Sequence, residues 1–168
     1  MPRDPKQRDG LSEFEQEFLR IIDEHGWHVM SVVMREGEEG IPWSYSTGIY
    51  YRFGHPEIIV FGETATLRLS MINAIGERVR DGERFEPGRG YAEIIGNFDC
   101  QFRPVDISHY KEYVGSSIWF YDRNPASFPL LQCFFPDMEG RFPWEPGCAQ
   151  WAIDTQPLLD KFTSKKGT

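Results

Sequence analysis

The sequence predicts an α+β fold, in which a single, largely antiparallel sheet has helices packed on one face. Helical and strand-like segments are mixed without a regular strand-helix-strand alternation, and no strand is followed by a glycine-rich phosphate loop. The chain has 168 residues, of which 40% are hydrophobic and 26% charged, as is usual for one globular domain. We therefore expect one domain over residues 11–160, between polar segments at 1–10 and 161–168.

The first helix is expected over residues 12–25. Ser12 and Glu15 have the form of a capping box, and Gly26 can end the helix in a left-handed conformation. The following residues, 27–34, are apolar on both faces, which is typical of a strand covered on both sides.

The second strand is expected to alternate along residues 43–51, with large side chains on one face and Ser44, Ser46 and Gly48 on the other. This pattern predicts a half-buried strand. The apolar run at 58–61 predicts a third strand, and Thr64 begins a helix with an apolar stripe that extends to Val79.

The second half of the chain predicts three more strands and a helical region. Residues 83–90 are expected to form a loop, and residues 109–121 one or two short helices. A tight turn is expected at Asp137–Gly140, before a segment rich in Pro and Trp that extends to Trp151. The strands are expected at 91–95, 98–103 and 130–135.

Composition excludes several classes of function. The net charge of −8 and the absence of a basic run argue against binding to nucleic-acid phosphates. No apolar segment has the length of a signal peptide or a membrane span, so we expect a cytoplasmic protein that does not enter the membrane. Three cysteines without short paired spacing indicate neither a disulfide framework nor a zinc ribbon.

His55 and Glu57 are the first candidates for catalysis. Pro56 favours an extended conformation for His55, and residues two apart in an extended chain share a face. The pair would then act as a general base and the carboxylate that orients it. The alternative is a structural His55 that fastens the turn by bonding to the backbone.

A ligand-binding wall is predicted from Tyr45, Thr47, Gly48 and Trp144. The hydroxyls of Tyr45 and Thr47 flank Gly48, where the missing side chain would let a ligand approach the backbone. The alternative is that Tyr45 and Thr47 only favour the strand and that Gly48 marks a bulge.

Cys148 is the third catalytic candidate, because it follows Pro146-Gly147 in a loop where an exposed thiol could act as a nucleophile with His55. Cys100 and Cys133 fit buried strand positions. We expect no metal site and no cofactor: Gly26 separates His25 from His28, no third ligand is evident, and no calcium-loop pattern is present.

The segments Tyr45-Ser-Thr-Gly-Ile49 and His55-Pro-Glu-Ile-Ile-Val-Phe-Gly62 resemble a bacterial family named for a domain of unknown function, number 4262. Further matching segments, in the same order, are Gly26-Trp27, Gly82–Pro87, Tyr110–Tyr121, Gly140-Arg-Phe-Pro-Trp144 and Gln156-Pro-Leu158. The resemblance covers most of residues 12–159. It implies a bacterial source but no reaction.

Three functional hypotheses remain open. The first is a non-catalytic binding or protein-interaction module, which fits an acidic chain in which 15% of residues are aromatic. The second is a small-molecule hydrolase or transferase that uses His55 and Glu57. A homodimer without a ligand is a third, weaker hypothesis.

Overall fold

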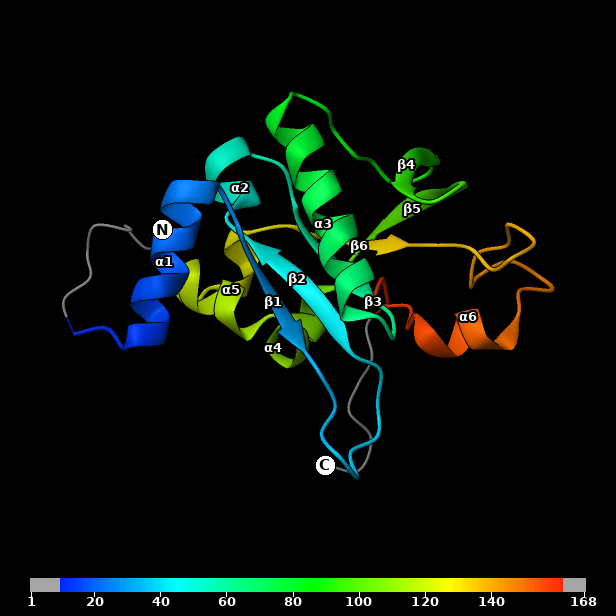
Figure 1. The fold of residues 1–168 in the computed structure, drawn as a ribbon, viewed down its shortest axis with the longest axis horizontal. Coiled ribbons are helices and arrows are strands. Elements are labelled where there is room, and N and C mark those ends of the chain that lie inside the picture. Colours follow the sequence, from blue (N-terminus) through cyan, green and yellow to red (C-terminus); the bar gives the residue numbers. More distant parts are fainter. Residues whose placement is uncertain (1–9, 162–168) are drawn as a thin grey trace.

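The structure is a computed structural model that describes residues 10–161 (Figure 1). Its helices and strands, in chain order, are α1 (Glu13–His25), β1 (His28–Val32), β2 (Trp43–Thr47), α2 (Ile49–Phe53), β3 (Glu57–Phe61), α3 (Ala65–Arg80), β4 (Tyr91–Ile95), β5 (Phe98–Pro104), η1 (Ile107–His109), α4 (Tyr110–Tyr113), α5 (Gly115–Phe120), η2 (Pro125–Ser127), β6 (Leu130–Phe134) and α6 (Gln150–Thr155). Across the described residues, no helix combines the length and apolar character that a membrane crossing requires.

The strands form one six-stranded sheet in the order β1-β2-β3-β6-β5-β4. Only β3 and β6 run parallel, and the four other neighbouring pairs are antiparallel. The predicted α+β class and the largely antiparallel sheet are therefore confirmed. The parallel pair lies at the centre, where both strands are fully buried.

Helices cover both faces of this sheet, whereas the sequence predicted them on one. Ile58 and Val60 of β3 pack in a core with α3, while Ile59 and Phe61 pack in a second core with α1, α4 and α5. Figure 1 shows α3 on one side of the sheet and α4 and α5 on the other. The physical reason is that every residue of β3 is apolar except Glu57, so both faces of the strand must be shielded from water.

The predicted strand at 43–51 is wrong beyond Thr47. Gly48 has a φ of 120°, which turns the chain into α2, so Ile49 and Tyr51 are helical. The strand was also predicted to be half-buried, but its small-residue face is covered too, because Ser44 and Ser46 are fully buried. A further helix, α6, was not predicted; it begins at Gln150, at the end of the segment rich in Pro and Trp, and continues to Thr155.

Local signals in the sequence are confirmed at several element ends. The Ser12–Glu15 capping box begins α1, and Gly26, with a φ of 112°, ends it. The turn at Asp137 forms as predicted, with the Gly140 amide donating to the Asp137 carbonyl. The remaining strands, and the helical region at 109–121, also form close to their predicted positions.

Candidate functional site

Glu57 lies at the start of β3 with a side chain that is completely buried. Its carboxylate accepts hydrogen bonds from two hydroxyls and three backbone amides. The donors are Ser46 Oγ at 2.7 Å, Tyr121 Oη, and the amides of Gly48, Ile49 and Tyr50 at 2.8, 3.2 and 3.3 Å.

This network explains why the chain leaves the sheet after β2. The first amides of a helix have no partner within the helix, and the Glu57 carboxylate supplies one for α2. Burial raises the pKa of Glu57, and the bonds from Tyr121, Ser46 and the amides oppose that rise. With five donors already bound, the carboxylate holds α2 against β2 and β3.

His55 is buried, and both of its ring nitrogens are hydrogen-bonded to the backbone. The Phe85 amide donates to Nε2 at 3.0 Å, so Nδ1 carries the proton and donates to the Pro56 carbonyl at 2.8 Å. Burial lowers the pKa of His55, which matches this neutral tautomer. No hydrogen bond joins the His55 ring to Glu57, so the geometry corresponds to the structural alternative rather than to a base oriented by a carboxylate.

Tyr45 and Thr47 face the core beneath α5 and bond to its residues. The Ser116 amide donates to Tyr45 Oη at 3.1 Å, and Thr47 Oγ1 lies 2.7 Å from Ser117 Oγ. A Cβ at Gly48 would stand 2.7 Å from the Gly26 carbonyl oxygen, so this glycine admits the α1–β1 connection. The predicted ligand wall is thus occupied by the protein's own chain.

Trp144 lies at another place in the fold and does not join Tyr45 and Thr47. Its ring stacks on Phe142 at a centroid distance of 5.1 Å, and the Arg103 guanidinium lies 3.7 Å from its centroid. These contacts fasten the segment after β6 to β5.

Cys148 is remote from His55. The strands β3 and β6 are parallel and begin side by side, and His55 precedes β3 whereas the loop with Cys148 follows the end of β6. Figure 1 shows this loop on the opposite side of the molecule from α2. Burial and the nearby Asp137 carboxylate raise the pKa of Cys148, which disfavours the reactive thiolate.

Asp137 was expected as a carboxylate in a turn, and in the structure it also organises the loop that holds Cys148. One carboxylate oxygen accepts from the Glu139 and Arg141 amides, each at 2.9 Å, and the other accepts from the Ala149 amide at 2.8 Å. These bonds lower the pKa of Asp137. The turn composition gave the position of this residue but not its partner twelve residues later.

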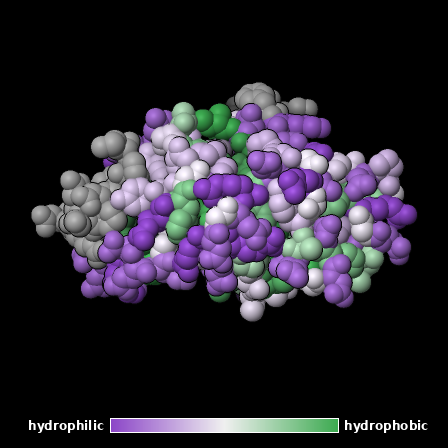
Figure 2. Space-filling view, turned by 90° about the horizontal axis from the view of Figure 1, so that it is seen from above, coloured by the Kyte–Doolittle hydropathy of each residue, from purple (hydrophilic) through white to green (hydrophobic). Residues whose placement is uncertain are grey.

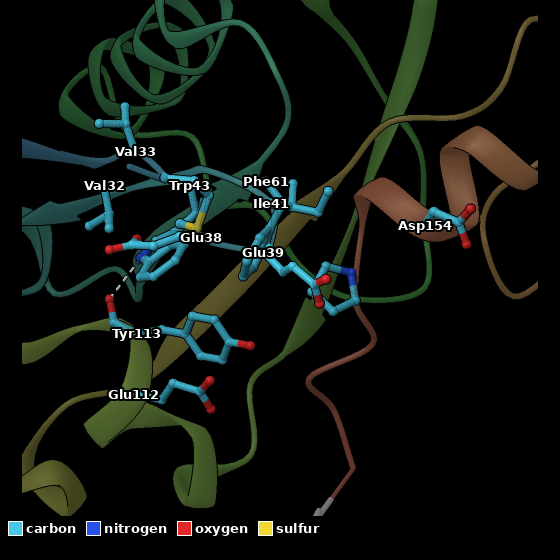
Figure 3. A pocket seen from close by; sticks show the side chains of 13 residues that line it. Val32, Val33, Glu38, Glu39, Ile41, Trp43, Phe61, Glu112, Tyr113 and Asp154 are labelled. Carbon is cyan, nitrogen blue, oxygen red and sulfur yellow. Dashed lines mark hydrogen bonds between the residues drawn. The ribbon is translucent and has the colours of Figure 1, made fainter. Parts of the chain in front are cut away.

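A cavity of about 480 Å³ opens between the β1–β2 loop, α4 and the segment around α6 (Figure 3). Trp43, Phe61 and Tyr113 line it with rings that contact one another at centroid distances of 5.0 to 6.0 Å. The Trp43 indole donates to the Tyr113 carbonyl at 2.9 Å, which joins β2 to α4. The aromatic wall is therefore held in place before any ligand arrives.

Four carboxylates line the same cavity from three separate parts of the chain. They belong to Glu38, Glu39, Glu112 and Asp154. Within residues 10–161, Glu39 and Glu112 form no ion pair, and no group of three or more His, Cys, Asp or Glu side chains is arranged to hold a metal ion. Burial, together with the charge of Glu112, raises the pKa of Tyr113.

The sequence contained the parts of this cavity without their arrangement. Trp43 was expected only as a strand residue, and the stretch from Glu36 to Gly40 lies between two expected strands. Their place beside the same cavity as Glu112 depends on tertiary packing that no local pattern encodes. The one signal in the sequence was the surplus of aromatic residues in an acidic chain.

Comparison with curated proteins finds no match, and comparison with solved structures finds none either. A family model matches residues 21–149, from within α1 to the end of the loop that holds Cys148. The matched range contains β1 to β6 and most of the cavity's lining, though not Asp154 or Pro157. The resemblance seen in the sequence is thus confirmed, and the chain belongs to the family described as Domain of unknown function (DUF4262).

Proposed function

We propose that this chain is a non-catalytic binding module of the bacterial cytoplasm, and that its cavity binds an organic cation, either an alkylammonium or a guanidinium group. The observation that carries the proposal is the combination of an aromatic wall and four carboxylates around one cavity. Rings attract cations through their faces, and carboxylates at the rim supply the opposite charge.

The distribution of charge supports an organic cation over a metal ion. A metal ion requires several ligands at bonding distance around one point, which the described carboxylates do not provide. A guanidinium group is planar and has five donors, so it can lie against a ring while it bonds to separate carboxylates. The cavity volume of about 480 Å³ exceeds that of one side chain and lies within the range of small-molecule sites.

The His55 region also supports a non-catalytic function. The His55 ring and the Glu57 carboxylate each use their polar atoms to hold the backbone in place. Figure 2 shows the face that carries α2 and one end of α3. Hydrophilic residues cover most of this face, and the hydrophobic residues on it lie in separate places. The aromatic cavity lies elsewhere, beside the β1–β2 loop and α4.

Titration with butylguanidinium, followed by NMR of the Trp43 indole N–H, tests this function. Butanol serves as the neutral control ligand. We expect saturable shifts of the Trp43 signal with butylguanidinium alone, and weaker binding as salt screens the carboxylates. Substitution of Glu112 or Glu39 by Gln should weaken binding about two- to five-fold each, as is typical of exposed ion pairs.

Glu86→Gln is the matched control, because Glu86 is an exposed carboxylate in the loop between α3 and β4. It removes the same charge at a distance from the cavity and should leave binding unchanged. Equal shifts with butanol, or equal weakening by Glu86→Gln, would show that the cavity does not select a cation.

A further inference from the structure

One edge of the sheet is open along β1 beyond His28, whose ring contacts the Phe14 and Phe18 rings of α1. This strand is first in the sheet order, and among the described residues only β2 pairs with it. Its sequence, from His28 to Val32, contains no Lys, Asp, Glu or Pro, which are the residues that usually protect an edge. Val33 follows with 61% of its surface exposed, so the apolar edge continues beyond the strand.

The opposite edge, β4, is blocked in two ways. The pairing of β4 with β5 shifts register between Tyr91 and Ile95, and Glu93 has a φ of 65°, which is the mark of a bulge. The Ala92 carbonyl already accepts a bond from the Arg78 guanidinium at 2.7 Å. The protein therefore protects one edge of its sheet and leaves the other unprotected.

The open edge leads directly into the cavity. Val32, Val33 and Met34 line the cavity together with Glu38 and Glu39 of the loop that follows them. In Figure 3, Val32 and Val33 lie on the same side as Trp43, and Tyr113 and Glu112 lie across from them. A strand laid along β1 would thus extend to the carboxylates at its end.

We infer that the partner of this module is an extended protein segment that adds to β1 as a seventh strand and inserts an Arg or Lys side chain into the cavity. The inference rests on the proposed function, because it assumes that the cavity binds a cation. In strand addition, main-chain hydrogen bonds provide affinity, and a pocket beside the edge provides specificity for a side chain. The two features are contiguous here.

Charge decides between a basic segment and a second copy of the chain. Pairing of β1 with β1 of a second copy would bring together two molecules that each carry a net charge of −8. The carboxylates that line the cavity beside the edge would add to this repulsion. A basic segment meets the opposite electrostatic field, and we therefore assign the edge to such a partner.

Selection of random dodecapeptides, displayed on phage, against the full chain tests the inference and does not require that the natural partner be identified. We expect enrichment of one Arg or Lys among residues that favour strands. The best selected peptide is then synthesised with single N-methyl groups along its backbone. Methylation at alternate positions should weaken binding about two- to ten-fold, because alternate amides pair with an edge strand.

Two variants with the same added charge test whether the peptide binds at the β1 edge or at the β4 edge. Val33→Lys places a cation on the open edge beside the cavity, and Ala92→Lys places one on β4, where Ala92 is also exposed. We expect Val33→Lys to abolish detectable peptide binding and Ala92→Lys to leave it unchanged, while circular dichroism confirms that both variants fold.

The outcomes distinguish the two proposals. If selected peptides require Arg or Lys but tolerate every N-methyl group, the cavity binds a cation and strand addition is refuted. If no basic residue is enriched and butylguanidinium does not bind, the proposed function itself fails. If light scattering shows a dimer that Val33→Lys dissociates, a second copy occupies the edge and the inference is overturned.

Discussion

Replacement of Glu57 by Ala should be among the most destabilising single changes in this protein. It removes the acceptor of the Gly48, Ile49 and Tyr50 amides, which begin α2. Each donor left without a partner costs about 1–3 kcal/mol, so the three amides together cost about 3–9 kcal/mol. The substitution also removes a buried carboxylate, whose unfavourable burial raises the pKa of Glu57, and this gain offsets part of the cost. We expect the free energy of unfolding to fall by about 3–5 kcal/mol.

Glu57→Gln is the matched variant, because it keeps the shape of the side chain. Its carbonyl can replace Oε2, which accepts from Gly48, Tyr50 and Tyr121, and its amino group then faces the Ile49 amide and the Ser46 hydroxyl, which can rotate to accept from it. One backbone amide is left unpaired instead of three. We expect a loss of about 1–3 kcal/mol.

Urea unfolding, followed by tryptophan fluorescence, measures both losses at neutral pH. The reasoning requires Glu57→Ala to lose more stability than Glu57→Gln, with unchanged dependence on urea concentration. A loss below about 1 kcal/mol for Glu57→Ala would mean that water or a rearranged α2 satisfies the amides, and would refute the structural role of the carboxylate.

Comparison of the wild type with Glu57→Gln also gives a prediction for the pH dependence of stability. Because the folded pKa of Glu57 is raised above its ordinary value of 4.5, protonation favours the folded state. The stability that this group contributes is complete below pH 4.5 and is lost as pH rises through the folded pKa. The free-energy difference between the wild type and Glu57→Gln should therefore narrow as pH rises. If the difference instead widens with pH, the five hydrogen-bond donors lower the pKa of Glu57 more than burial raises it.

The remaining predictions concern the core and its titrating groups. Gly76→Ala would place a Cβ 2.5 Å from the Trp27 ring and should cost about 1–3 kcal/mol in urea unfolding, whereas Gly115→Ala, with no atom within 4 Å, should cost nothing. Burial lowers the pKa of His28 to about 4, so the stability that it contributes is lost as pH falls from 6.5 through that value, and an NMR titration midpoint near 6.5 would contradict its burial. A thiol reagent should label only Cys148 in the native state and all three cysteines in urea, and native labelling of Cys100 or Cys133 would show that the core opens.

The elements that follow from local chemistry could be predicted from the sequence. The Ser12–Glu15 capping box, the stop at Gly26 and the apolar stripe of α3 depend on residues within a few positions of one another. The same holds for the apolar run of β3. A local pattern is sufficient there because the interactions that define each element are themselves local.

The end of β2 could not be predicted from its alternation. The pattern from Trp43 to Tyr51 fits a strand throughout, and the chain turns into α2 at Gly48 because Glu57, nine residues later, binds the amides of the turn. His55 shows the same limit, since the partner of its Nε2 is the Phe85 amide, thirty residues away. The sequence indicated His55 and Glu57 as candidate site residues, but the packing of distant segments determines their hydrogen-bond partners.

By itself, the sequence determined the family, the α+β class and the position of most helices and strands, because periodicity and capping are carried by neighbouring residues. Only the tertiary structure decided that helices cover both faces of the sheet, that Tyr45 and Thr47 bond to α5, and that Trp144 lies beside Arg103 instead. It alone brought the aromatic residues and carboxylates of the cavity together. Contacts between distant segments depend on the order of strands in the sheet, and that order is not written in any local pattern.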